Sequence, residues 1–71
     1  MVNKKHSITI NRHRTSITIE PLFWDSLKNI AKENKTSLSN IIEKIDENDP
    51  KNLSSAIRVF VLKYYKNKFD F

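Results

Sequence analysis

The sequence contains no cysteine and no glycine, and each absence excludes classes of protein. Without cysteine, the chain has neither a disulfide framework nor a thiolate metal site. Without glycine, no glycine-rich phosphate-binding loop can form, and a cysteine nucleophile is missing too. Asp25 and Glu33 share a predicted helix face with no histidine in reach, and His6 and His13 are poor in further metal ligands. We therefore expect a protein that is not an enzyme and that has no metal or other cofactor.

The chain is short, and it has no long apolar run. At 71 residues it is one small domain, close to the lower limit at which a single hydrophobic core suffices. Because disulfides are excluded, association with a second chain is the remaining route to a larger core. The longest uncharged stretch runs only from Thr36 to Ile42, and residues 1–11 lack an apolar core of signal-peptide length. We expect a cytoplasmic protein with no membrane partner.

Positive charge dominates and is unevenly distributed. The net charge of +5 and the pI of about 9.7 favour a polyanionic partner, although charge alone does not choose nucleic acid over an anionic membrane. Residues 1–14 hold four cationic side chains and no acidic one, whereas Glu43 to Asp49 is net acidic. The cationic side chains of the first segment are Lys4, Lys5, Arg12 and Arg14.

A change of hydrophobic period marks the start of the folded core. From Arg14 to Glu20 the residues alternate, so that one face holds Thr15, Ile17 and Ile19. This period of two predicts a half-buried strand, which needs a partner strand for its backbone. The opposite face carries an arginine and two hydroxyl groups, a composition suited to hydrogen bonding with base edges in a DNA groove.

Three helices are predicted after this strand. The first runs from Pro21 to about Asn34, and Asn34 or Lys35 should take the left-handed conformation that ends it. Ser37 or Thr36 should cap the second helix, whose apolar residues Leu38, Ile41, Ile42 and Ile45 recur at helical spacing.

The third helix, predicted from Leu53 to about Lys68 with Asn52 as its cap, has two apolar faces. Each apolar face needs a packing partner. The first two helices could pack on one face, and a second subunit could pack on the other. A helix lying on a membrane surface is the weaker alternative, since its charged face is thin. One face comprises Leu53, Ala56, Ile57, Phe60, Val61 and Tyr64, and the other comprises Val59, Leu62, Tyr65 and Phe69.

The N-terminal segment admits two interpretations. Ser7-Ile8-Thr9-Ile10 recurs as Ser16-Ile17-Thr18-Ile19. Residues 1–13 could therefore contain a short extra strand that turns back at residues 11–14, or they could form a disordered basic arm lying on DNA.

The order of strand, helix, turn and helix resembles the ribbon-helix-helix DNA-binding proteins of the Arc and MetJ kind, and is most similar to a bacterial subfamily of small domains. Its motifs include Arg14–Leu27, Ser37–Ser39 and Asn52–Leu62, within a match that covers most of residues 14–66. Lys35 departs from the pattern, because relatives often carry glycine there. The resemblance implies an α+β, mostly α fold: a ribbon-helix-helix domain over residues 14–68 with an added third helix, followed by a tail at 69–71. Two chains would intertwine and share a two-stranded antiparallel β-ribbon.

The resemblance also implies roles for individual residues. Arg14, Ser16 and Thr18 would face the bases in the major groove. The amides that open the second helix, at Ser37, Leu38 and Ser39, would hold a backbone phosphate. The basic N-terminal segment would add phosphate contacts through Lys4, Lys5, Arg12 and His13. The dimer core would comprise Thr15, Ile17, Ile19, Phe23, Ile41, Ile45 and Phe60.

Two functions then compete. The first is a sequence-specific transcriptional regulator, a repressor that occupies an operator in double-stranded DNA as a homodimer and could add further copies there. The second is a protein-interaction module or an antitoxin-type DNA-binding component with the same fold. Antitoxins usually carry an extra toxin-binding segment, and few residues follow Lys66, which favours the regulator. No small-molecule ligand is expected in either case.

Overall fold

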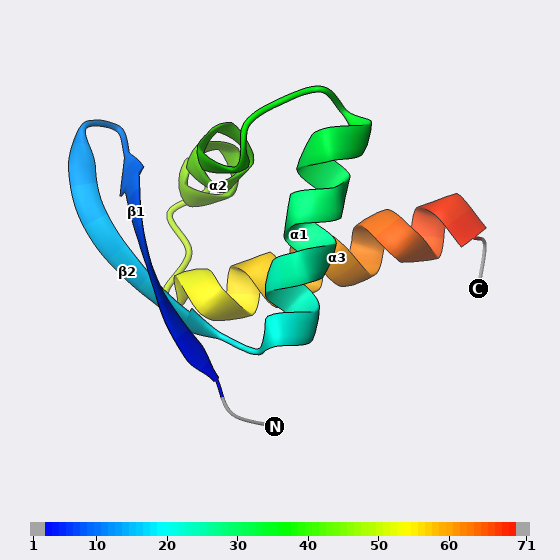
Figure 1. The fold of residues 1–71 in the computed structure, drawn as a ribbon, viewed down its shortest axis with the longest axis horizontal. Helices are drawn as coiled ribbons and strands as arrows, with labels where there is room; N and C mark the ends of the chain where they lie inside the picture. Colours follow the sequence, from blue (N-terminus) through cyan, green and yellow to red (C-terminus); the bar gives the residue numbers. More distant parts are fainter. Residues whose placement is uncertain (1–2, 70–71) are drawn as a thin grey trace.

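The computed structural model describes residues 3–69, which form two strands followed by three helices (Figure 1). The elements are β1 (Lys4–Ile10), β2 (His13–Ile19), α1 (Pro21–Glu33), α2 (Leu38–Asp46) and α3 (Leu53–Phe69). The predicted fold class, an α+β and mostly helical ribbon-helix-helix arrangement with an added C-terminal helix, is confirmed. Of the predicted tail, Phe69 ends α3, and residues 70 and 71 lie outside the described residues, as do residues 1 and 2.

The N-terminal segment forms a strand, and β1 and β2 pair as an antiparallel hairpin around Asn11 and Arg12. Both turn residues have positive φ, 49° and 67°, as the twist of a tight two-residue hairpin requires. The partner that the strand at 13–19 needs is therefore supplied by its own chain. The sharing of a ribbon between two chains stays a prediction.

Side-chain and backbone caps define the helix ends without any glycine. At the end of α1, the amide of Thr36 donates to the Ala31 carbonyl at 3.0 Å and that of Lys35 to the Lys32 carbonyl at 3.2 Å. This is the Schellman pattern, with Lys35 left-handed at φ 53°. The Ser37 hydroxyl caps α2 by accepting the Asn40 amide at 3.0 Å, so the predicted cap is confirmed.

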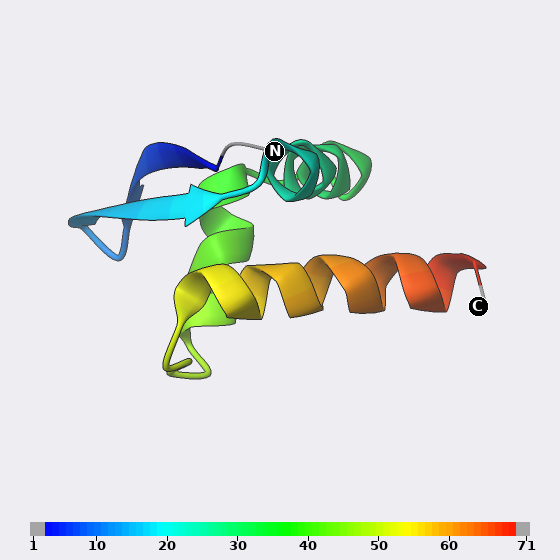
Figure 2. The same ribbon diagram turned by 90° about the horizontal axis from the view of Figure 1, so that it is seen from below.

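The core lies where the inward face of the hairpin meets all three helices. Figure 2 shows α1 and α3 at two levels, with α2 standing between them and the hairpin at one end. Isoleucine is the commonest buried residue, and its β-branched side chain suits the pleated strands. The buried residues are Ile10, Ile17, Ile19, Leu27, Ile30, Ala31, Ile41, Ile42, Ile45, Ile57 and Val61.

Polar contacts attach the hairpin to α2 and α3. The amide of Asn11, in the hairpin turn, donates to Glu43 Oε1 at 2.9 Å. At the other end of β2, the Ser54 hydroxyl donates to the Thr18 carbonyl at 2.9 Å. Arg58 Nε donates to Glu20 Oε1 at 2.8 Å, and this hydrogen bond is the main reason why the pKa of Glu20 is held below its ordinary value of 4.5.

The left-handed conformation of Lys35 generates a stability prediction. A residue with a Cβ pays about 1–2 kcal/mol in this region, whereas glycine pays about 0.5–1 kcal/mol in backbone entropy. Lys35→Gly should therefore raise the free energy of unfolding by up to about 1 kcal/mol in urea denaturation. Lys28→Gly, the same change at an exposed position inside α1, should lower it by about 1 kcal/mol. Equal destabilisation by both variants would contradict the left-handed turn.

The Glu20–Arg58 pair generates a pH prediction. A carboxyl with a lowered pKa in the folded state stabilises the fold above its ordinary pKa, and that contribution is lost as the pH falls through the folded value. Acidification from about pH 6 to about pH 3 should therefore lower the urea midpoint less in Glu20→Gln than in the parent. Arg58→Met, which removes the donor, should reduce the acid sensitivity in the same way. An identical acid response in parent and Glu20→Gln would mean that the pair does not form in solution.

Candidate nucleic-acid interface

The outward face of the hairpin is polar, cationic and exposed. Strand alternation places on this face the residues predicted to contact bases, and all three are exposed. The pairing sets Arg14 opposite Thr9, Ser16 opposite Ser7, and Thr18 opposite Lys5. We call this surface the ribbon face, and none of its side chains is acidic. It consists of Lys5, Ser7, Thr9, Arg14, Ser16 and Thr18.

The ribbon face contains residues that sequence reasoning did not assign to it. Ser7 and Thr9 were given no role, and Lys5 was assigned to phosphate contact. A shallow hollow on this face is lined in part by Lys5, Ser7 and Arg14, so two cationic side chains border one depression. The repeat of Ser-Ile-Thr-Ile was the signal that could have found the β1 residues. The sequence alone did not decide between a strand and an arm.

The other basic residues of the N-terminal segment lie apart from the ribbon face. Arg12 is in the hairpin turn, while Lys4 and His13 alternate onto the inward side at opposite ends of the ladder. All three are exposed, since the helices do not cover the ends of the hairpin. The structure therefore distributes the predicted phosphate contacts around the ribbon face.

The residues predicted to form a dimer core lie in or against the core of the single chain. Ile17, Ile19, Ile41 and Ile45 are buried there. Phe23 and Phe60 are half-buried against the same cluster, and Thr15 is half-buried on the inward side of β2.

The predicted phosphate clamp is at the start of α2. Ser37 uses its hydroxyl as the helix cap, Leu38 packs against the core, and Ser39 is half-buried. The amides at the start of a helix are not all satisfied within the helix, and the helix dipole favours an anion there. This end is therefore chemically able to hold a phosphate oxygen.

Two basic side chains of α3 are already engaged in ion pairs. Arg58 pairs with Glu20, and Lys68 Nζ lies 2.6 Å from the Glu33 carboxylate. The hydrogen bond that Lys68 donates to the Glu33 carboxylate is the main cause that raises the pKa of Lys68. These contacts join α3 to the end of β2 and to the end of α1, so both cations serve the fold.

An aromatic stack under β1 was not predicted. The rings of His6 and Trp24 lie 3.9 Å apart between centroids and are nearly parallel, at 10°. Phe23 and Trp24 are adjacent on α1 and cannot both face the core squarely. Trp24 lies against an inward residue of β1, a contact that the helix pattern alone could not reveal.

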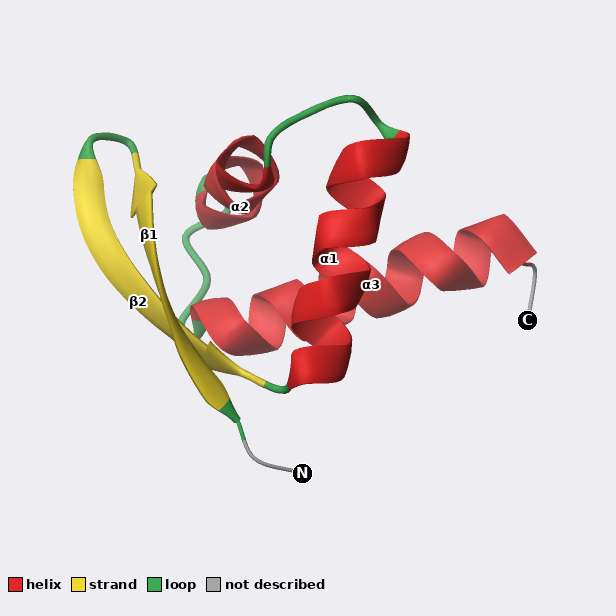
Figure 3. Ribbon diagram, viewed as in Figure 1, coloured by secondary structure: helices red, strands yellow, loops and turns green. Residues whose placement is uncertain are grey.

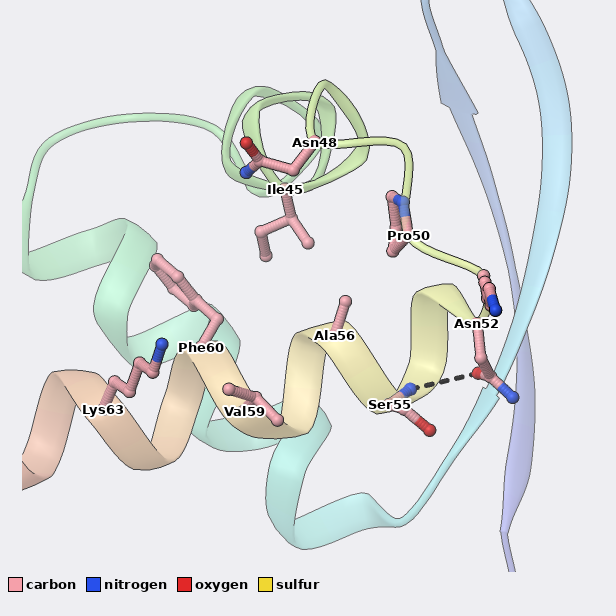
Figure 4. Close-up of a pocket in the computed structure, with 10 residues that line it drawn as sticks. Ile45, Asn48, Pro50, Asn52, Ser55, Ala56, Val59, Phe60 and Lys63 are labelled. Atoms are coloured by element: carbon pink, nitrogen blue, oxygen red, sulfur yellow. Dashed lines mark hydrogen bonds between the residues drawn. The ribbon is translucent and has the colours of Figure 1, made fainter.

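Part of the second apolar face of α3 is open. Val59 and Leu62 are 51% and 59% exposed, although both are aliphatic. Figure 4 shows Ile45, Ala56 and Phe60 around a groove between α2 and α3, with the Asn52 side chain accepting the Ser55 amide at 3.1 Å to cap the helix. The floor of this groove is apolar, and Lys51 and Lys63 lie at its border.

Within residues 3–69, no helix combines the length and apolarity needed to cross a bilayer. No three histidine, cysteine or acidic residues of this range gather in a way that could hold a metal ion.

Comparisons with known proteins agree with the geometry. The model of the ribbon-helix-helix domain family matches residues 3–65, a range that includes both strands. A search of curated proteins and a search of solved structures returned no match. Domains of this family are generally DNA-binding regulators. The family match spans nearly all of the elements described above, and the chain belongs to the ribbon-helix-helix family.

Proposed function

We propose that this protein is a sequence-specific transcriptional repressor that inserts its β-ribbon into the major groove of double-stranded DNA. The observation that carries the proposal is the ribbon face, where two cations and four hydroxyl groups are exposed together without an acidic side chain. A two-stranded ribbon fits the major groove, where arginine or lysine recognises guanine and hydroxyl groups accept or donate to several bases. Repression would follow from occupying an operator, and the site of action would be the bacterial cytoplasm.

The proposed division of labour separates base readout from positioning. Arg14, Ser16 and Thr18 read bases, because they project from the exposed face of β2. The start of α2 and the exposed cations around the ribbon face position the ribbon through phosphates, which carry no sequence information directly. These cations are Lys4, Lys5 and Arg12, and His13 lies beside Arg12.

We also propose that the regulator acts as a homodimer. The exposed Val59 and Leu62 on α3 supply an apolar face that a second copy could cover. Such a contact leaves the ribbon face free, because the open face of α3 and the ribbon face belong to different elements. Two linked ribbons would bind two neighbouring DNA elements more tightly than either ribbon alone.

Replacing Arg14 tests readout by the ribbon. A duplex selected from a random DNA pool supplies the specific site, and fluorescence anisotropy gives the affinities for it and for random duplex. Arg14→Ala should cost roughly 1–3 kcal/mol on the selected site and much less on random DNA, because a bidentate contact to guanine is lost. Lys51→Ala removes an exposed cation from the loop before α3 and should lack this selectivity. Equal losses on both duplexes for Arg14→Ala would reduce its role to a phosphate contact.

A charge placed at the start of α2 tests the phosphate clamp. Ser39→Glu adds an acid in the first helical turn, which the helix dipole favours, so the melting temperature should hold. The same charge repels an incoming phosphate, so DNA affinity at low salt should fall. Ser55→Glu makes the matched change in the first turn of α3 and should lower affinity only by the general charge effect. Equal affinities for the two variants would show that the start of α2 does not contact the DNA backbone.

A further inference from the structure

The two strands of the hairpin carry corresponding residues at almost every position. Lys5-His6-Ser7-Ile8-Thr9-Ile10 of β1 matches Arg14-Thr15-Ser16-Ile17-Thr18-Ile19 of β2. The first position is cationic in both, and the last four are identical. Only His6 and Thr15 differ in chemical kind.

The antiparallel pairing of the hairpin converts this repeat into a local two-fold symmetry. Ser7 lies directly opposite Ser16. On one side of this pair Lys5 faces Thr18, and on the other side Arg14 faces Thr9. A half-turn about an axis between the two serines therefore exchanges the two cation–threonine pairs. Any antiparallel pairing of two repeated strands has such an axis, and this register places it between Ser7 and Ser16.

The fold accounts for the matching isoleucines but not for the matching outward residues. Ile10, Ile17 and Ile19 are buried in the core, where any such strand needs apolar side chains. The inward side departs from symmetry where it meets the helices, because His6 stacks on Trp24. The six residues of the ribbon face are exposed, so packing places no demand on them. Their symmetry points to an external partner that is itself two-fold symmetric.

The hairpin of one chain is already a two-stranded ribbon. β1 occupies one edge of β2 along its whole length. At the other edge, the Ser54 hydroxyl from the first turn of α3 already holds the Thr18 carbonyl. Figure 3 shows the two strands standing as one ribbon beside the helices. A second copy is not required to form a two-stranded reading surface.

We propose that the hairpin of a single chain reads a short, approximately palindromic DNA element, with Arg14 recognising a guanine in one half and Lys5 a guanine in the other. This inference rests on the proposed function and deepens it, because it assigns Lys5 to base readout instead of phosphate contact. Proteins with two-fold symmetry bind palindromic sites, since the symmetry of the duplex then matches their own. Lysine and arginine both suit the guanine edge, so the two halves require the same base.

The geometry of the strands sets the expected spacing of the two guanines. Lys5 and Arg14 each precede the central serine of their strand by two residues, and the strands run in opposite directions. With about 3.4 Å per residue and about 4.8 Å between strands, their Cα atoms lie about 14 Å apart. That distance corresponds to about four base-pair steps of roughly 3.4 Å. The two guanines should lie on opposite DNA strands.

Selection of binding sites from a random duplex pool by a set of variants tests the proposal. The set is the parent, Arg14→Ala, Lys5→Ala, Lys5→Arg and the control Lys51→Ala. In the parent motif, two guanines should be related by a local dyad. Arg14→Ala should lose preference for one of them and Lys5→Ala for the other, each by roughly five- to a hundredfold. Lys5→Arg should make the selected element more nearly palindromic, and Lys51→Ala should leave the motif unchanged.

The outcomes separate this inference from the proposed function. If Arg14→Ala removes the preference in both halves at once while Lys5→Ala weakens selected and random duplexes alike, two copies of β2 form the ribbon and the inference is overturned. If the parent selects no duplex and binds none by anisotropy, the proposed function itself fails. Circular dichroism melting of each variant checks its fold, and the exposure of Lys5 and Arg14 predicts unchanged melting temperatures.

Discussion

The pairing of β1 with β2 is the interaction on which the rest of the structure depends. A lone strand leaves a row of unpaired backbone groups, which are costly wherever water cannot reach them. By folding back at Asn11 and Arg12, the chain satisfies one edge of β2 and at the same time places Ile10 on the same side of the hairpin as Ile17 and Ile19, where all three join the core. The pairing thus creates the apolar side on which the helices pack and the polar side that is free to bind. Both surfaces follow from the alternation of one ladder.

A chain without glycine must form its turns with residues whose Cβ makes a positive φ sterically unfavourable. Asn11, Arg12, Lys35 and Asp49 take that conformation, and asparagine and aspartate are the residue types that do so most readily. Arg12 and Lys35 have no such advantage, so the surrounding contacts must hold them. At the hairpin turn the Glu43 carboxylate accepts the Asn11 amide, and after α1 the carbonyls of Ala31 and Lys32 accept two amides. Tertiary and capping hydrogen bonds here stabilise a backbone conformation that glycine would adopt without strain.

The sequence predicted the elements well because the signals for them are local. The period of β2, Pro21 at the start of α1, and the caps Ser37 and Asn52 all act within a few residues, and the structure confirms them. The partner of β2 stayed open between an extra strand and a second chain, because Asn11 suits the hairpin turn but Arg12 stands where such turns favour glycine. The stacking of His6 on Trp24 and the contact of Ser54 with Thr18 depend on that pairing and were missed with it. Most of the candidate site was found from β2 alone, and the β1 half of the ribbon face was not.

The two sides of the ribbon show how one short repeat can meet two different demands. The inward residues pack against three helices that are not related by symmetry. His6 and Thr15 can therefore differ although they occupy corresponding positions in the two strands. The outward residues do not pack against the protein, so only a binding partner can require a symmetric pattern on that side. A duplex offers the same backbone geometry when turned about a dyad, whereas a protein partner or a membrane surface has no such requirement. The symmetry of the ribbon face therefore favours DNA over the other polyanionic partners that the net charge of +5 would allow.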